Sequence, residues 1–210
     1  MSDSAKAAAI LARALEYPYS TPDRSYLYLD GEAAELPREG PDLDGRSPLI
    51  AYGANAAPAS LARKLTQLPG VEMPVLRFEL EGFDAVYSAH VSPYGAVPAT
   101  LIESPGTVAP AFLLHPTADQ LALLSASELN YDLVEIDGAA AYRSKHGCLE
   151  LDGSPVALAA VRSAGRTLPE LDEPAILDRV RSHLRPELSL QEFVLDCAGR
   201  GGIKPLAPLT

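Results

Sequence analysis

The chain has 210 residues, 47% of them apolar and 21% charged, a composition typical of one globular domain with short additions. Its 17 Lys and Arg against 28 Asp and Glu give a formal net charge of −11, which disfavours nucleic acid as a partner. A membrane-spanning helix needs about 18 uninterrupted apolar residues, and no stretch of this sequence is that long, so we expect no membrane association.

The cysteine content and the N-terminus predict a cytoplasmic protein. Cys148 and Cys197 are the only cysteines and lie in no CxxC motif, which favours two buried thiols in a reducing compartment. The apolar run near the N-terminus is broken by Arg13 and Glu16, so it is too short for the apolar core of a signal peptide.

Residues 1–47 are predicted to form a helix and an extended appendage that lies against the main domain. Apolar residues at helical spacing indicate a helix over 2–16, and Pro18 ends it. The following stretch is rich in Pro, Gly and acidic residues. It contains one predicted strand, 26–29, with a turn at Asp30-Gly31.

The core domain is predicted over residues 48–165. It opens with a short buried strand over 49–52, a sharp turn at Gly53-Ala54-Asn55 and a helix that begins near Pro58. Breaks at Glu81-Gly82 and at Ser104-Pro105-Gly106 interrupt the next apolar stretch, and we read the second break as a tight turn between two strands. The segments predicted in this stretch are 75–78, 85–87, 98–102 and 107–114.

The rest of the chain adds one more helix to the core and then a helical extension over 166–210. Pro116-Thr117 opens the core helix, and Asp137-Gly138 and Asp152-Gly153 read as hairpin turns rather than metal sites. Further strands are predicted over 131–137, near 147–151 and over 155–162, and C-terminal helices over 173–184 and 190–197. The class is therefore α+β with a mixed sheet or barrel, flanking helices and a C-terminal helical extension.

The first candidate site is the loop Tyr52-Gly53-Ala54-Asn55. A strand that ends in this pattern before a helix collects unpaired backbone N–H groups near a helix N-terminus, which favours an anion such as a carboxylate. Gly53 permits close approach to the backbone, and Asn55 either caps the helix or contacts the ligand. The alternative is an ordinary strand-to-helix turn with an Asn cap.

The second candidate is Glu128, at the end of the helix that contains Leu124-Ser125-Ala126-Ser127 and just before the strand at Tyr131. A carboxylate in that place is often solvated and without function. If neighbouring residues cover it, however, its basicity rises towards that of a useful general base.

The two motifs together, in this order, resemble the gamma-glutamylcyclotransferase-like family, also called the AIG2-like family. Its members carry Tyr-Gly-Ser-Asn before a helix, and later Leu-Asp-x-x-Glu at the end of another helix. The resemblance covers residues 48–137 and includes the strands on either side of Ser104-Pro105-Gly106. This chain departs from the pattern at Ala54, Ser125 and Leu129, where the family has Ser, Asp and often Gly.

The resemblance implies a gamma-glutamylcyclotransferase-like barrel or sheet and a cyclotransferase, a reaction of transferase or lyase type. A γ-glutamyl amide would cyclise to 5-oxoproline and release an amine, without metal or cofactor. Glu128 would be the general base, and Tyr52, Gly53, Ala54, Asn55 and Tyr131 would bind the small-molecule substrate. An enzyme of this kind should direct Glu128 into a pocket beside the amides of residues 52–55.

Two other functions, each from a different class of protein, are also compatible with the sequence. A non-catalytic module would keep the same fold and bind a small acidic metabolite or a partner, which Ala54 and the missing Asp favour. An interaction protein would use the apolar residues of the C-terminal helices, although these are equally typical of core packing. Those residues are Leu177, Val180, Leu184, Leu190, Phe193 and Val194.

The remaining polar residues form no recognisable catalytic or metal motif. The four histidines lack HxH, HExxH or Cys/His spacing, and Ser88 and Ser92 lack the elbow sequence of a serine hydrolase. His90 ends a strand and could line the same cavity as Glu128. Tyr94 and Tyr131 are typical packing residues that could also wall a pocket.

Overall fold

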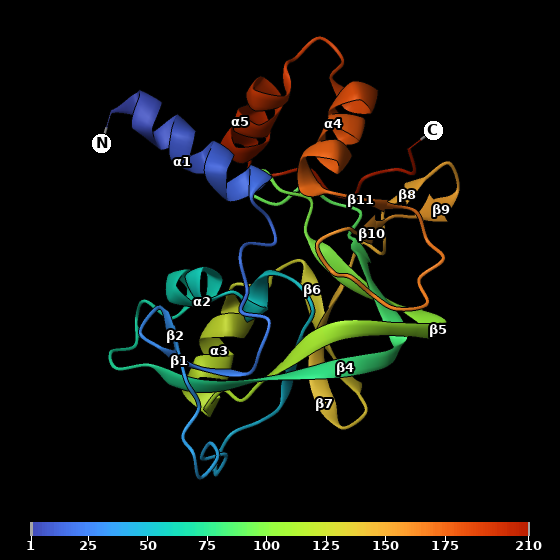
Figure 1. Cartoon of the computed structure of the whole chain (residues 1–210). Helices are drawn as coiled ribbons and strands as arrows, with labels where there is room; N and C mark the ends of the chain where they lie inside the picture. The colour runs from blue at the N-terminus through green and yellow to red at the C-terminus, as the bar shows by residue number, and fades with distance from the viewer. Residues whose placement is uncertain (1, 210) are drawn as a thin grey trace.

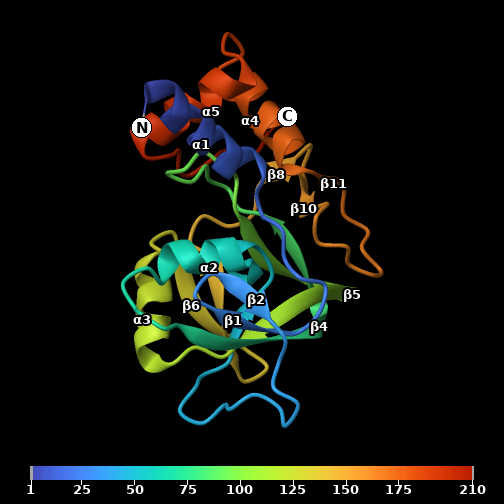
Figure 2. The same cartoon turned by 60° about the vertical axis from the view of Figure 1, so that its left-hand side comes forward.

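The computed structural model describes residues 2–209 and shows an α+β protein with two ends of different character. Three helices gather at one end, and a large sheet with two shorter helices forms the other (Figure 1, Figure 2). Helix α1 packs against both C-terminal helices, α4 and α5, so the two ends of the chain meet in one helical layer. The helices are α1 Asp3–Leu15, α2 Pro58–Lys64, α3 Ala118–Ala126, α4 Glu173–Leu184 and α5 Leu190–Arg200, with a 3-10 turn η1 at Ala54–Ala56.

Nine strands form the large sheet in the order β11-β10-β4-β5-β3-β7-β6, with the β1–β2 hairpin attached through β1 to β4. The sheet is mixed, because β3 runs antiparallel to β5 but parallel to β7. Within residues 2–209 it does not close into a barrel. The strands are β1 Tyr26–Leu29, β2 Glu32–Ala34, β3 Leu49–Ala51, β4 Glu72–Tyr87, β5 Ala99–Leu114, β6 Tyr131–Ile136, β7 Ala139–Ser144, β10 Ala157–Leu158 and β11 Glu170–Leu171, with a separate pair of β8 Glu150–Leu151 and β9 Ser154–Pro155.

The expectation of a tight turn at Ser104-Pro105-Gly106 is wrong. Strands β4 and β5 each run for 16 residues and pair with one another on both sides of this segment. The register jumps from Glu81–Val108 to Phe83–Glu103, so Gly82 stands opposite the four residues 104–107. The two breaks expected from the sequence are therefore the two sides of one bulge, which interrupts the ladder without ending either strand.

The hairpin turn at Asp137-Gly138 is confirmed, but its second strand, β7, is absent from the sequence prediction. Both turn residues have positive φ, 50° and 80°, as a two-residue hairpin turn requires. Strand β7 begins Ala-Ala-Ala, and Ala has low β propensity. The strand predicted over 155–162 shortens to two-residue pairings at β9 and β10.

The helix signals of the sequence are accurate. The hydroxyl of Ser2 accepts the N–H of Ala5 at the start of α1, and Thr117 forms a reciprocal capping box with Gln120 at α3. Helix α4 has the predicted bounds, and α5 extends three residues beyond its predicted end. In these two helices the side chains of Leu177, Val180, Phe193 and Val194 are fully buried within this chain. These four are therefore core residues and are not available to a partner, whereas Leu184 is 37% exposed and Leu190 is half-buried.

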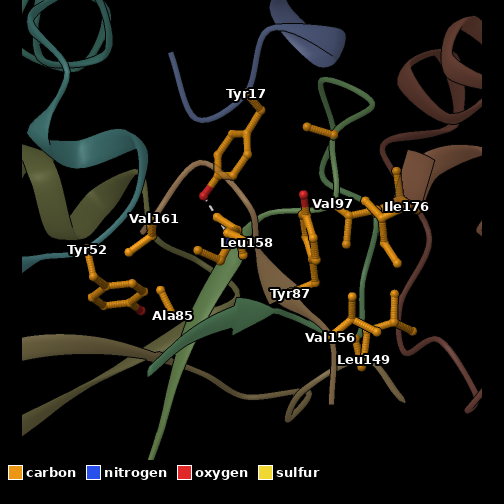
Figure 3. Close-up of a cluster of buried hydrophobic side chains, with 14 of the residues drawn as sticks. Tyr17, Tyr52, Ala85, Tyr87, Val97, Leu149, Val156, Leu158, Val161 and Ile176 are labelled. Carbon is orange, nitrogen blue, oxygen red and sulfur yellow. Dashed lines mark hydrogen bonds between the residues drawn. The ribbon is translucent and has the colours of Figure 1, made fainter. Parts of the chain in front are cut away.

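The core has two clusters of buried side chains. The larger cluster joins the end of β4 and the start of β5 to α4 and to the segment around β10. Figure 3 shows Tyr87, Val97 and Ile176 of this cluster. The smaller packs α2 and α3 against β1 and β3, through residues such as Leu61 and Leu124. Within residues 2–209, no helix has the length and apolar character needed to cross a bilayer.

A buried ion pair connects β4 with the start of the C-terminal extension. The carboxylate of Asp84 accepts hydrogen bonds from Nε and Nη2 of Arg166 at 2.8 and 2.7 Å, and the hydroxyl of Ser163 donates to it at 2.8 Å. Both charged side chains are almost inaccessible to solvent. Breaking such a pair leaves an uncompensated buried charge, so the extension is held firmly on the core.

Glu173, the first residue of α4, is a buried acid that makes stability depend on pH. Glu173 is only 2% exposed to solvent. Its Oε1 accepts a hydrogen bond from the N–H of Val97 at 2.6 Å, and its Oε2 has no hydrogen-bond partner among the described residues. Burial raises the pKa of Glu173 well above its ordinary value. The unfolded chain therefore loses this proton first as pH rises, and the folded state is progressively destabilised until the raised pKa is passed.

We expect Glu173→Gln to be more stable than the wild type at neutral pH, because Gln is neutral and resembles the protonated acid. The difference in unfolding free energy between the two proteins should grow by more than about 1 kcal/mol from about pH 4 to about pH 8. Urea denaturation across this range measures it, with the exposed Glu79→Gln as control. An unchanged difference across the range would show that Glu173 ionises normally in the fold.

Candidate functional site

The site residues predicted from the sequence line one cavity of about 560 Å³. The loop after β3, the end of α3 and the start of β6 supply one part of its wall, and residues 13–19 and the loop 88–98 supply another. All six predicted site residues line this cavity, namely Tyr52, Gly53, Ala54, Asn55, Glu128 and Tyr131. Two segments that are 73 residues apart in sequence are thus brought to one place.

Glu128 lies in a closed triangle of side chains with Asn55 and Lys64. Its Oε1 accepts a hydrogen bond from Nδ2 of Asn55 at 3.0 Å and forms a short ion pair with Nζ of Lys64. The same ammonium donates to Oδ1 of Asn55 at 2.6 Å. The side chains of Lys64 and Glu128 are 20% and 12% exposed, so the pair is largely shielded from bulk water. No described residue donates a hydrogen bond to Oε2, which leaves that oxygen available to a ligand.

Asn55 does not cap the helix, contrary to one of its two expected roles. The residue lies inside the 3-10 turn η1, and the N-cap of α2 is Ala57, which offers no side-chain acceptor. The amide of Asn55 orients Glu128 instead. Helix α2 has only seven residues, so the helix dipole contributes little to an anion site at this loop.

Two backbone N–H groups of this cavity-lining loop have no hydrogen-bond partner among the described residues. Neither the N–H of Ala54 nor that of Asn55 donates a hydrogen bond to another residue of the described chain. Gly53 is needed here for packing, since a Cβ at this position would lie 2.9 Å from the hydroxyl of Tyr17 and 3.1 Å from Cβ of Ala99. The side of Gly53 that was expected to face a ligand is thus contacted by Tyr17.

Buried tyrosines form much of the remaining wall, and most of their hydroxyls are already engaged. The hydroxyl of Tyr52 donates to the carbonyl of Tyr142, and that of Tyr131 donates to the carbonyl of Ala99 at 2.8 Å. Tyr17 accepts the N–H of Ala99 at 2.8 Å, the contact drawn in Figure 3. Burial raises the pKa of Tyr17, Tyr52 and Tyr131, so these residues are neutral hydrogen-bonding groups.

His90 lines the same cavity, as its position at the end of a strand suggested. Its Nδ1 lies 2.6 Å from the hydroxyl of Ser88, which in turn donates to Ser144. Burial, together with the neighbouring His146 and Lys204, lowers the pKa of His90 to about 3. The imidazole is therefore neutral at physiological pH. Among the described residues, no three His, Cys, Asp or Glu side chains gather as a set of metal ligands.

Four cationic residues of the wall were not among the predicted site residues. Arg13 comes from the end of α1, Arg63 and Lys64 from α2, and Lys204 from the C-terminal tail. Lys204 donates to Oδ1 of Asn130 at 2.9 Å, two residues beyond Glu128. The contact of Lys204 with Asn130 joins segments 74 residues apart, and no local pattern indicates it. Tyr94, proposed only as a possible pocket residue, also lines the cavity.

No family model, curated protein or solved structure matches this chain at a significant level. The resemblance to the gamma-glutamylcyclotransferase-like family therefore depends on the two short motifs and on the geometry described above. The family assignment stays a prediction.

We expect Gly53→Ala to destabilise the protein by about 1–3 kcal/mol, the usual cost of overpacking a buried site. The added methyl group would displace Tyr17, which is buried and hydrogen-bonded to Ala99. Gly199→Ala is the matched control, because Gly199 is exposed in α5 with no atoms nearby and should gain up to about 1 kcal/mol of helix propensity. Chemical denaturation compares the two, and equal effects would contradict the close approach at Gly53.

Proposed function

We propose that this protein is a gamma-glutamylcyclotransferase-like enzyme that cyclises a γ-glutamyl amide to 5-oxoproline and releases an amine. The observation that carries the proposal is the position of Glu128, whose free Oε2 and the unpaired N–H groups of Ala54 and Asn55 belong to one cavity. A base and an oxyanion site on one cavity are what an intramolecular attack on an amide carbonyl requires.

The reaction needs no outside nucleophile. Glu128 takes a proton from the α-ammonium of the glutamyl group, and the freed amine attacks the γ-carbonyl carbon of the same molecule. A new C–N bond forms, and the N–H groups of Ala54 and Asn55 hold the developing oxyanion. The amide C–N bond then breaks as Glu128 returns protons to the leaving nitrogen. Two of the three ammonium protons end on the released amine and one stays on the lactam nitrogen, so no water is consumed.

Asn55 and Lys64 prepare the base for this role. Both donate to Oε1, which fixes the carboxylate and leaves Oε2 for the substrate. The ammonium of Lys64 also repels a substrate ammonium bound to the same carboxylate. A like charge at this distance favours loss of the substrate proton, which produces the amine nucleophile.

The second candidate function is a non-catalytic module that binds a small acidic metabolite. The Lys64–Glu128 pair favours it, because the carboxylate already has a cationic partner within the chain. The loop residue Ala54 also lacks the hydroxyl that the family pattern has. A module of this kind would bind γ-glutamyl compounds without releasing 5-oxoproline.

The first test is turnover of a panel of γ-glutamyl amino acids, γ-glutamylamines and glutathione, with 5-oxoproline detected by mass spectrometry. We expect release from at least one member and a loss of about a hundredfold or more in Glu128→Gln, since the amide cannot accept the proton. Glu79→Gln, an exposed change in β4, is the control and should retain activity. Binding without release would favour the module, and full activity in Glu128→Gln would eliminate the proposed base.

We expect Lys64→Met to shift the rise of kcat with pH to higher pH by about one pH unit, because the substrate ammonium then keeps its proton longer. Lys64→Arg retains the charge and should keep a profile close to that of the wild type. Rate profiles at saturating substrate measure the shift. A profile that is lower at every pH but does not move would assign Lys64 a purely structural part.

A further inference from the structure

The cavity wall has the opposite charge balance from the chain as a whole. Acidic residues outnumber basic ones by 28 to 17 in the sequence, yet the cavity is lined by four Lys or Arg side chains and by a single carboxylate, Glu128. Lys64 neutralises that carboxylate. The remaining three cations, Arg13, Arg63 and Lys204, give the cavity an excess of positive charge that composition does not explain.

Two of these cations are held in place by aromatic rings. The guanidinium of Arg13 lies 4.3 Å from the ring centroid of Tyr94, and that of Arg63 lies 4.4 Å from the ring of Tyr19. The hydroxyl of Tyr19 donates to the backbone carbonyl of Arg13 at 3.0 Å, which ties the two stacks together. Within residues 2–209 neither guanidinium has a carboxylate within 4.0 Å. Both guanidinium groups are therefore stacked on tyrosine rings and have no carboxylate partner among the described residues.

The two arginines contact other residues of the cavity wall than Glu128 does. Arg63 and Lys64 are consecutive in α2, so their side chains leave the helix about 100° apart. Lys64 turns to Glu128, whereas Arg63 turns to Tyr19 in the N-terminal segment. Both arginines and Glu128 line the same cavity, so a ligand held at Glu128 shares that cavity with the two guanidinium groups.

We propose that Arg13 and Arg63 form a second anion subsite that binds an oxyanion, a carboxylate or a phosphate, on the amine portion of the substrate. The inference rests on the proposed function, which puts the glutamyl end at Glu128. Guanidinium groups match the planar, two-oxygen geometry of a carboxylate and form charge-assisted hydrogen bonds with it. The substrate class is then γ-glutamyl amides of acidic amines, in preference to those of neutral or cationic amines.

The experiment measures binding in the Glu128→Gln background, where the ligands are not consumed. Calorimetry compares γ-glutamylglycine, which carries a carboxylate on its amine portion, with γ-glutamylmethylamide, which does not. We expect the first to bind at least about tenfold more tightly, which corresponds to about 1.4 kcal/mol. Adding Arg13→Gln and Arg63→Gln should abolish this ratio and leave binding of the neutral ligand unchanged.

Controls separate charge from folding. Arg77→Gln removes an exposed arginine of β4 and should keep the ratio. The double change Arg13→Lys with Arg63→Lys preserves the charge and should retain part of it, whereas a general loss of structure would weaken both ligands alike. An unaltered ratio after the double Gln change would overturn the subsite.

Inorganic phosphate distinguishes failure of the subsite from failure of the proposed function. If neither γ-glutamyl ligand binds but phosphate binds and is lost in the double Gln variant, the subsite stands and the glutamyl assignment falls. If γ-glutamylmethylamide binds as tightly as γ-glutamylglycine, the subsite falls and the glutamyl assignment stands. If phosphate and both ligands fail to bind, both proposals are wrong.

Discussion

The antiparallel pairing of β4 with β5 is the constraint on which the rest of the structure depends. Each strand has 16 residues, and together they connect β1, β3 and β10 into one sheet. Strand β5 begins at Ala99, whose N–H donates to Tyr17 and whose carbonyl accepts from Tyr131. One residue at the start of a strand thus positions two tyrosines of the cavity wall.

The triangle of Asn55, Lys64 and Glu128 depends on that frame. Asn55 follows β3, Lys64 ends α2, and Glu128 follows α3, so three separate elements must be docked before any of these contacts forms. The partly shielded surroundings strengthen each charged contact relative to bulk water. Removing Lys64 or Glu128 would leave the other charge without its partner in partly shielded surroundings. Both donors of the triangle bind Oε1 of Glu128, so the triangle holds one carboxylate oxygen and leaves the other free.

Local patterns were sufficient for the helices and for most turns, and they failed where pairing is long-range. The cap at Thr117 lies directly before the helix that it starts, so the sequence indicates it directly. Gly82 and Ser104-Pro105-Gly106 carry the same residue types in a bulge as in a hairpin turn, and only the register of the partner strand distinguishes the two. Strand β7 is held by its neighbours on both sides, which compensates for its alanines.

The candidate site shows the same division. Glu128 and the loop Tyr52-Gly53-Ala54-Asn55 were found from motifs, because each lies at the junction of two local elements. The partnership of Glu128 with Lys64 spans 64 residues, and the stack of Arg63 on Tyr19 joins α2 to the N-terminal segment. Such contacts exist only after folding, and composition alone would describe Arg13 and Arg63 as solvated surface residues.

The two segments predicted to lie outside the core domain, 1–47 and 166–210, both contribute residues to the cavity wall. Arg13, Tyr17 and Tyr19 come from the predicted appendage 1–47, and Lys204 from the predicted extension 166–210. Tyr17 occupies the space beside Gly53, and Lys204 reaches Asn130 next to the loop of Glu128. The core supplies the carboxylate and the backbone donors, while the two ends of the chain supply most of the unpaired positive charge. If the core performs the chemistry, selection of the amine depends on Arg13 of the N-terminal segment together with Arg63 of the core, so the proposed site extends beyond residues 48–165.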